Sequence, residues 1–505
     1  MNPRLALLLL RPLAALGGGL AMACAFPPLA WWWIAPIAVL LCVLSTRRVR
    51  PVWAATYGAI AGAAFFGPLL FWMSVVGVDA WISLTAICTA WWIGLFVAQS
   101  FAQRCVWWPV VVPALWVASE AIRGAIPLGG FPWGRLAFSQ AGGPLLPLNS
   151  IVGPAGVAYT LAFVACAVVY LLLDGRSGAP LAHTIVVAIG AVSLSMLLAF
   201  GYVAMNAVGT EDQVTIAVVQ GGVPGSGLSA MGEKRAVLAN HAQITRTALR
   251  SRSDIDFVAW PENSSDIDPF RDPLARRQID EAVRTVGKPI LVGAVVDAPN
   301  DPSRVANSGI VWDPETGPGA RYVKRHPVPF GEFIPFRQLL GSLLDRFRLV
   351  PRDFIAGDVP GVLEIAGTTV GDVICFEVAY DSIVRDVVIA GAEIIVVQTN
   401  NATYAGTAQL EQQVAMSQVR AVEHGRSVVV AATSGISAVI NPNGSIRSSI
   451  AANESGVIVE RMALSNQQTV ATSWAPRIEW LLVGIAVAPF ACVGLSRLRL
   501  QRSRT

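Results

Sequence analysis

Long apolar runs fill the first 206 residues of this 505-residue chain, and only short polar stretches separate them. A helix that crosses a bilayer needs roughly 20 apolar residues, and eight segments approach that length. They are residues 5–23, 29–45, 53–76, 81–101, 106–122, 151–173, 182–206 and 478–496. The pattern therefore predicts a membrane α-helical bundle with eight transmembrane helices.

The stretch from 207 to 475 has the mixed polarity of a globular domain. Short β-branched runs predict strands at 214–219, 257–260, 290–296, 321–324, 370–375, 394–397 and 428–432. Apolar residues at three- and four-residue spacing predict helices at 233–251, 273–286, 380–390 and 408–424. Alternation of this kind is typical of a layered α/β domain in which helices cover sheets.

Charge separates the same regions. Residues 1–206 hold only three of the chain's 33 acidic side chains. That depletion, together with 54% hydrophobic residues and 16 Trp, indicates an integral membrane protein. We expect three parts, which are residues 1–206 with seven helices and a loop at 119–150, a globular domain at 207–475, and an eighth helix with a basic tail at 476–505.

Arginine positions predict the topology. Arginines lie between or after the apolar runs at Arg47, Arg48, Arg50, Arg104, Arg176, Arg497, Arg499, Arg502 and Arg504. The positive-inside rule assigns such residues to the cytoplasm, so we expect cytoplasmic termini and an extracytoplasmic globular domain. The net charge of +4 is explained by this topology and gives no reason to expect a nucleic-acid partner.

The first apolar segment is expected to remain in the protein as a membrane span. Pro12 and the glycines at 17–19 interrupt it, and no small-residue cleavage site stands out. A cleaved signal peptide is the alternative.

One cysteine stands apart from the others. Cys375 is the only one of seven within the globular stretch, and the other six lie in or beside apolar runs. It therefore has no soluble partner for a disulfide. A thiol alone at the end of an apolar strand is either inert core or a nucleophile.

Two further polar groups follow predicted strands, Glu262 and Lys324. A carboxylate takes up the proton of a thiol, and an ammonium stabilises an oxyanion, so with Cys375 they would form a complete nucleophilic set. Lysine is also rare here, with three among 37 basic residues, which suggests that a compact ammonium is required at Lys324. Taken singly, each residue has a common structural explanation, as core filler, turn or solvated surface.

The ordered combination of motifs is more specific. The chain contains Trp260-Pro261-Glu262-Asn263, then a long run from Tyr322 through Lys324, Phe330, Gly331 and Glu332 to Pro335, then Ile374-Cys375-Phe376-Glu377. This combination resembles the Glu-Lys-Cys constellation of the nitrilase superfamily. The sequence around Lys324 and the apolar segments before it narrow the resemblance to the apolipoprotein N-acyltransferase family. This resemblance covers essentially the full length of the chain. The fold that it implies for the globular domain is an extracytoplasmic nitrilase-like α-β-β-α sandwich.

The resemblance also implies roles for individual residues. Glu262 would be the general base, Lys324 the stabiliser of the tetrahedral intermediate and Cys375 the nucleophile. Glu332 matches a glutamate that orients lysine and substrate, and Glu377 one near the acyl-accepting site. Trp133 (in Gly130-Phe131-Pro132-Trp133-Gly134), Phe376 and Asn400 are further expected substrate-binding or supporting residues.

The reaction that this family carries out implies the partners. An acyl chain would pass from a phospholipid to Cys375 as a thioester, and then to the α-amino group of the N-terminal diacylglyceryl-cysteine of an apolipoprotein. The protein would then be a multi-pass monomer of the inner or plasma membrane. We expect no cofactor and no metal, because the four histidines show no ligand spacing and no Gly-rich phosphate loop occurs.

The sequence departs from the family pattern in two places. No tryptophan follows the Gln-Gly of the first strand within residues 223–231, and Asn400-Asn401-Ala402-Thr403-Tyr404 stands where Asn-Asp-Ala-Trp-Phe is common. Both changes concern groups that line or gate the substrate cleft.

The apolar residues between 330 and 347 have two explanations. They either pack in the core or enter the membrane interface. Two other functions also fit parts of the sequence. A membrane-tethered nitrilase-type amidase would use the same three residues, and a receptor or transporter would use none of them.

Overall fold

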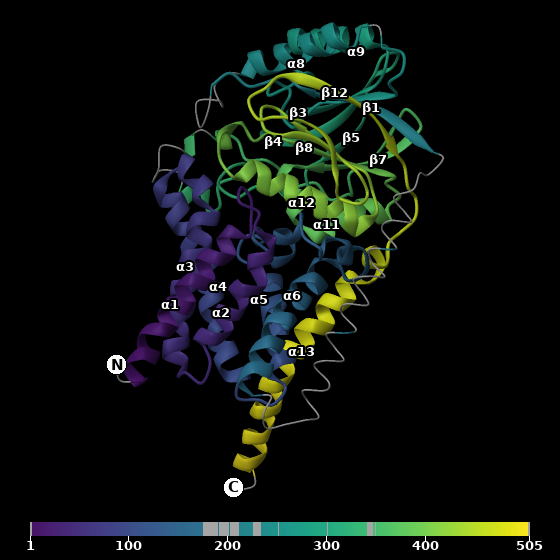
Figure 1. Cartoon of the computed structure of the whole chain (residues 1–505). Helices are drawn as coiled ribbons and strands as arrows, with labels where there is room; N and C mark the ends of the chain where they lie inside the picture. Colours follow the sequence, from purple (N-terminus) through teal and green to yellow (C-terminus); the bar gives the residue numbers. More distant parts are fainter. Residues whose placement is uncertain are drawn as a thin grey trace. The chain divides into compact units, whose positions relative to one another are not determined.

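The computed structural model describes residues 3–174, 212–225, 234–250, 252–299, 301–340, 347–348 and 350–502, with Gly190 and Gly201. The chain divides into two compact units (Figure 1). A helical unit comprises residues 1–202 and 473–505, and a second unit comprises residues 203–472. The predicted span at 182–206 lies outside the described residues apart from two glycines.

The helical unit contains seven of the α-helices that the structure describes. They are α1 (Pro3–Cys24), α2 (Ala35–Ser45), α3 (Pro51–Leu69), α4 (Val78–Ala102), α5 (Trp108–Arg123), α6 (Asn149–Leu173) and α13 (Val470–Arg502). α3 packs closely on α4 because Gly58 and Gly62 present no side chain. A Cβ at Gly58 would stand 2.8 Å from the Trp92 carbonyl oxygen, and one at Gly62 would stand 2.9 Å from Thr89 Cγ2. Small residues four apart commonly allow membrane helices to approach in this way.

Three of the described helical segments are long and apolar enough to cross a membrane, Pro51–Leu69, Val78–Ala102 and Leu146–Leu173. Two shorter apolar helices are Leu10–Cys24 and Trp32–Ser45. α2 and α5, in two of the predicted spans, have 11 and 16 residues, fewer than the roughly 20 that a bilayer requires. The helices fit a membrane region, and the number eight stays a prediction.

The buried guanidinium of Arg135 lies close to glutamates on two different helices of the helical unit. Nε of Arg135 lies 3.6 Å from Oε2 of Glu120 on α5, and its Nη2 lies 3.6 Å from Oε1 of Glu479 on α13. Arg135 is 5% exposed. A buried ion is tolerated only where opposite charges compensate it, so the two glutamates make this arginine compatible with the helical interior.

The second unit contains two six-stranded sheets. The first has the order β12-β1-β2-β3-β4-β5 and the second β11-β10-β9-β8-β7-β6. Strands of the first sheet are β1 (Gln213–Gln220), β2 (Phe257–Ala259), β3 (Ile290–Ala298), β4 (Asp301–Asp313), β5 (Gly317–Val323) and β12 (Gly456–Ala463). Strands of the second are β6 (Val362–Ile365), β7 (Thr368–Ile374), β8 (Ile394–Thr399), β9 (Val428–Ala432), β10 (Ser437–Ile440) and β11 (Ile446–Ile450).

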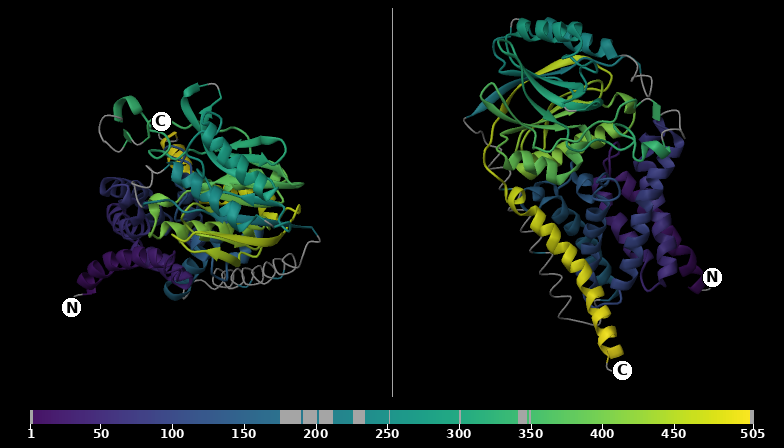
Figure 2. Two further views of the ribbon diagram at one scale, coloured as in Figure 1. Left: turned by 90° about the horizontal axis from the view of Figure 1, so that it is seen from above. Right: turned by 180° about the vertical axis from the view of Figure 1, so that it is seen from behind.

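The sheets face each other and helices cover their outer faces. Apolar side chains from both sheets form one buried core, among them Ile216, Leu291, Val370, Val396 and Val429. On the outer side of the first sheet lie α8 (Lys234–Ala248) and α9 (Pro273–Val286), and along the second lie α11 (Asp381–Ile389) and α12 (Gln409–His424). Figure 1 and the right-hand view of Figure 2 show these helix pairs on opposite sides of the strands. A short helix, α10 (Arg337–Leu340), follows the lysine motif.

The α-β-β-α layering agrees with the expectation for this domain. The seven predicted strands and four predicted helices are all present. The sequence pattern does not predict β4, β6, β10, β11 or β12.

Candidate active site

The predicted base and lysine are in direct contact. Glu262 stands three residues after β2, and Lys324 directly follows β5. Nζ of Lys324 lies 2.9 Å from Oε1 of Glu262 and 3.0 Å from Oε1 of Glu332. The Lys324 and Glu262 side chains are almost completely buried. Two carboxylates thus share one ammonium inside the domain.

Asn307 completes this cluster, although no sequence motif points to it. It lies on β4, and its Nδ2 donates to Oε1 of Glu262 at 2.7 Å and to Oε1 of Glu332 at 2.8 Å. Its carbonyl oxygen accepts from the backbone N–H of Lys324. Asn307 therefore holds both carboxylates and the start of the loop at residues 324–336, called the lysine loop below. The signal that it leaves in the sequence is weak, namely two adjacent polar residues, Asn307 and Ser308, in an otherwise apolar stretch of β4.

Backbone close to Glu262 holds its position. The N–H of Asn400, just after β8, donates to Oε2 of Glu262 at 2.8 Å. The Asn400 side chain accepts from Thr433 Oγ1 at 3.0 Å, so its amide supports the strand end. Gly293 on β3 leaves room for this segment, because a Cβ there would stand 2.2 Å from the Pro261 carbonyl oxygen.

Glu332 is fixed by the turn that carries it. Its Oε2 accepts from the Val328 N–H at 2.6 Å, and its own N–H donates to the Val328 carbonyl at 2.8 Å. Its carbonyl oxygen accepts from the Phe354 N–H. Glu332 therefore faces Lys324 in a defined orientation.

Cys375 begins a 3-10 helix, Cys375–Ala379, directly after β7. Its φ of 55° lies in the left-handed region, which non-glycine residues rarely adopt. The residue is half-buried and packs against the core between the sheets. Strain at such a position is typical of a functional site.

The surroundings keep the Cys375 thiol protonated. Burial raises its pKa to about 12, the charge of Glu262 adds to the increase, and Lys324 and a hydrogen bond with Thr399 oppose it. The second unit therefore holds a protonated thiol whose pKa responds to the charge of Glu262.

Lys324 keeps its charge in the same site. Burial by itself would lower the pKa of Lys324, but the charges of Glu262 and Glu332 raise it well above its usual range. At neutral pH the site thus contains a permanent ammonium.

Glu377 joins the lysine loop to the cysteine turn, which is the 3-10 helix Cys375–Ala379. Its carboxylate is fully buried. It accepts from Tyr322 Oη at 2.9 Å and from the backbone N–H groups of Arg325, His326 and Ile374 at 2.7, 3.0 and 2.8 Å. These contacts favour a supporting role, in which Glu377 fixes Lys324 relative to Cys375.

The aromatic residues proposed for substrate binding differ in their surroundings. Phe376 is half-buried, and its ring lies 5.4 Å from that of Tyr380. Trp133 belongs to the helical unit, is 1% exposed and lies 5.5 Å from the Trp72 ring. Its complete burial favours packing within that unit.

The apolar side chains between residues 330 and 347 include both exposed and buried ones. Phe330 and Phe336 are 44% and 75% exposed, whereas Ile334 and Phe347 are buried together. Asp353 anchors the segment by accepting from the Ile334 N–H and from Arg337. Core packing and interfacial exposure therefore apply to different residues of one segment.

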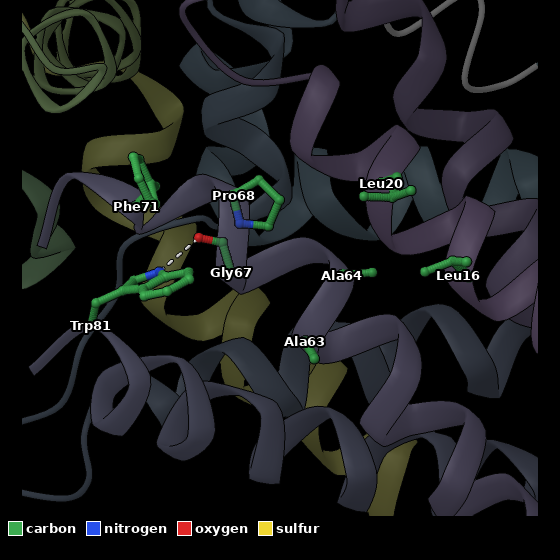
Figure 3. A pocket seen from close by; sticks show the side chains of 8 residues that line it. All are labelled: Leu16, Leu20, Ala63, Ala64, Gly67, Pro68, Phe71 and Trp81. Atoms are coloured by element: carbon green, nitrogen blue, oxygen red, sulfur yellow. Dashed lines mark hydrogen bonds between the residues drawn. The ribbon is translucent and has the colours of Figure 1, made fainter. Parts of the chain in front are cut away.

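The described residues contain no group of three or more His, Cys, Asp or Glu side chains that would hold a metal ion. A separate apolar pocket of about 570 Å³ lies in the helical unit (Figure 3). Leu16, Leu20, Phe71 and Trp81 are among its lining residues, and Trp81 Nε1 donates to the Gly67 carbonyl at 2.9 Å. No titratable side chain lines it, so it supplies space for apolar groups and no acid-base chemistry.

Comparisons with known proteins cover both units. Residues 18–167 match the family described as apolipoprotein N-acyltransferase N-terminal domain, and residues 215–472 match the carbon-nitrogen hydrolase family. A Mycolicibacterium smegmatis protein named apolipoprotein N-acyltransferase is 38% identical over 528 positions, covering 97% of this chain and 87% of that protein. One of the same name from Shewanella oneidensis is 27% identical, covering 96% and 95%. An amidase structure from Nesterenkonia sp. covers 52% of this chain and 92% of its own, with TM-score 0.38 and 18% identity.

Proposed function

Since the chain belongs to the apolipoprotein N-acyltransferase family, we propose that it moves an acyl chain from a phospholipid to the N-terminal diacylglyceryl-cysteine of an apolipoprotein. The acceptor is the free α-amino group of that cysteine. Cys375 carries the acyl chain between the two lipids, with Glu262 as base and Lys324 as stabiliser of charge. One difficult transfer is thereby divided into two easier ones.

In the first step, Glu262 takes the proton of the Cys375 thiol while the sulfur attacks the ester carbonyl carbon of the phospholipid. The tetrahedral oxyanion forms beside the ammonium of Lys324, which stabilises the negative charge. When the carbon–oxygen ester bond breaks, the departing alkoxide receives the proton held by Glu262. A lysophospholipid leaves and Cys375 remains as a thioester.

In the second step, the neutral α-amino group attacks the thioester carbon. Such amines have a pKa near 8, so a substantial part is already neutral at pH 7. Glu262 takes the surplus proton from the nitrogen as the carbon–sulfur bond breaks. The proton then returns to the sulfur, and an amide is formed without a cofactor.

The contacts of Lys324 with Glu262 and Glu332 carry the proposal. The charges of Lys324 and Glu262 act on the thiol of Cys375, which stands at a strained turn. Together these residues supply every group that the two steps require. A receptor or transporter needs none of this arrangement.

Both substrates are anchored in lipid, so the site has to meet the membrane surface. The exposed Phe330 and Phe336 on the lysine loop suit contact with acyl chains. We place the second unit on the extracytoplasmic face, with both termini cytoplasmic and eight spans, on the basis of the arginine distribution and the apolar segments. We also propose that the protein acts as a monomer.

Purified full-length protein mixed with phospholipid vesicles tests the proposal. Intact-mass spectrometry should detect one acyl adduct, removable by hydroxylamine, and lysophospholipid should appear in equal amount. Cys375→Ala should form no adduct and Cys375→Ser should not turn over. Ammonia release from soluble amides without lysophospholipid would identify the amidase alternative instead, and an unaltered rate in Cys375→Ala would exclude the thioester.

A further inference from the structure

One carboxyl group inside the second unit has no part in the proposed chemistry. Asp372 lies on β7, three residues before Cys375, and it is fully buried. Within the described part of the chain, neither of its oxygens has a hydrogen-bond partner. An isolated carboxylate is too costly to keep ionised in an interior, so its protonation state requires an explanation.

A glycine in the facing sheet makes room for this side chain. A Cβ at Gly309, on β4, would stand 1.8 Å from Oδ2 of Asp372 and 2.7 Å from Oε1 of Gln398. The two oxygens are therefore neighbours above the same glycine. Oε1 of Gln398 likewise has no donor among the described residues.

The other end of the Gln398 amide determines which way it points. Its Nε2 donates to the Trp260 carbonyl oxygen at 2.5 Å. A carbonyl only accepts, so the amide has to turn its nitrogen toward Trp260 and its oxygen toward Asp372. Two facing oxygens repel unless one carries a proton, and only the carboxyl of Asp372 is able to do so.

Nearby charges act in the same direction. Burial, followed by the charges of Glu377 and Glu262, raises the pKa of Asp372 well above its usual range. The ammonium of Lys324 is already shared between two other carboxylates. No free cation among these groups compensates an ionised Asp372.

We propose that Asp372 is a positioning residue, a neutral acid whose hydrogen bond to Gln398 fixes the amide that holds the Trp260 carbonyl. Trp260 stands two residues before Glu262, and Asn400, two residues after Gln398, donates to the Glu262 carboxylate. The contacts thus connect the strand of the nucleophile with the strand end of the base. The kinetic consequence rests on the proposed function, whereas the protonation state does not.

Infrared difference spectroscopy tests the protonation state without turnover. The spectrum of full-length Asp372→Asn in detergent at pH 8 is subtracted from that of the wild type. We expect the C=O stretch of a protonated carboxylic acid in the wild type that the variant lacks. Loss of a carboxylate band instead would overturn the proposal.

Kinetics test the positioning role through a conservative rescue. Asparagine keeps an N–H donor for Gln398, so Asp372→Asn should form the acyl adduct within about threefold of the wild-type rate, whereas Asp372→Ala should be about tenfold slower at unchanged KM. Gln398→Met should lower the rate of adduct formation by a similar factor. The double variant that combines Gln398→Met with Asp372→Ala should be no slower than either single variant.

Two results would contradict the positioning role. One is an equal loss in Asp372→Asn and Asp372→Ala, and the other is a wild-type rate in Asp372→Ala. If wild-type protein forms no adduct at all, the proposed function fails, and the infrared comparison still decides the state of Asp372.

Discussion

Nδ2 of Asn307 lies 2.7 Å from Oε1 of Glu262, the same oxygen that accepts from Lys324. Oε1 of Glu262 therefore accepts one hydrogen bond from an amide and one from an ammonium. The second oxygen accepts from one backbone N–H, that of Asn400. It consequently retains the capacity to take up a proton from the thiol or from the acceptor amine.

Asn307→Asp should slow acyl-adduct formation by about 100-fold or more. A third carboxylate beside Glu262 and Glu332 opposes their ionisation and removes the shared donor. Intact-mass spectrometry at timed intervals measures the rate. Asn443→Asp introduces the same charge in an exposed turn and should leave it unchanged; a variant at 307 as fast as that control would exclude the role given to Asn307.

Lys324→Arg should lose at least about 100-fold in rate although it keeps the charge. The side chain is buried between Glu262 and Glu332, and a planar guanidinium does not fit the space of a compact ammonium. Lysophospholipid release measures turnover. Lys288→Arg, at a half-buried position away from these carboxylates, provides the matched control, and equal activity of both variants would show that charge alone suffices at 324.

The reactivity of Cys375 should follow its raised pKa. With a thiol pKa of about 12, alkylation by iodoacetamide should keep rising up to pH 10, without the midpoint near 8.5 of a free thiol. Glu262 raises this pKa and Lys324 lowers it. Glu262→Gln should therefore speed alkylation at pH 8 while stopping acyl transfer, and Lys324→Met should slow both.

Peptide mass spectrometry of the Cys375 peptide separates this signal from the other cysteines. A wild-type midpoint near pH 8.5 would refute the prediction.

Glu377→Gln should destabilise the second unit. Backbone donors from both the lysine loop and the cysteine turn converge on this carboxylate, and an amide offers one acceptor oxygen in place of two. A buried donor left without a partner costs about 1–3 kcal/mol, so the melting temperature of full-length protein should fall by roughly 2–10 °C.

Tyr322→Phe should have a smaller effect, because it removes one donor and leaves the backbone bonds of Glu377 intact. The opposite order of the two variants would argue against Glu377 as the link.

Phe336→Glu should weaken use of phospholipid without unfolding the protein. This side chain is 75% exposed on the lysine loop, and burial of a Phe in lipid contributes about 1.5–3 kcal/mol. KM for phospholipid in vesicles should rise about 10-fold or more, with an unchanged melting temperature. Leu274→Glu alters an exposed apolar residue at the start of α9 and should behave as wild type. An equal KM for phospholipid in Phe336→Glu and Leu274→Glu would contradict a contact between Phe336 and lipid.

The strands that the sequence predicts include the most strongly apolar runs of the second unit. β8 contains the run Ile394-Ile395-Val396-Val397, and β9 consists of Val and Ala throughout, so their hydrophobic pattern is clear. β4 has no such pattern, because Asn307 and Gly309 face the active site and Asp372 in place of the core. A strand that carries part of the active site is therefore among the five that the sequence pattern fails to predict.

The candidate site divides in the same way. Glu262, Lys324 and Cys375 are predictable because each ends a recognisable strand in a motif of known order. Asn307 and Asp372 are not, since their partners come from pairing of β3, β4 and β5 and from facing sheets, which no local pattern contains.

The ion pair between Arg135 and Glu479 has a consequence for biosynthesis. Glu479 lies on α13, so the ribosome makes it only after the whole second unit, more than 300 residues after Arg135. Until then the guanidinium has only Glu120 of these two partners. The contact between Arg135 and α13 therefore forms last, and a chain truncated before residue 479 would leave the buried guanidinium with Glu120 alone of the two glutamates and without its link to α13.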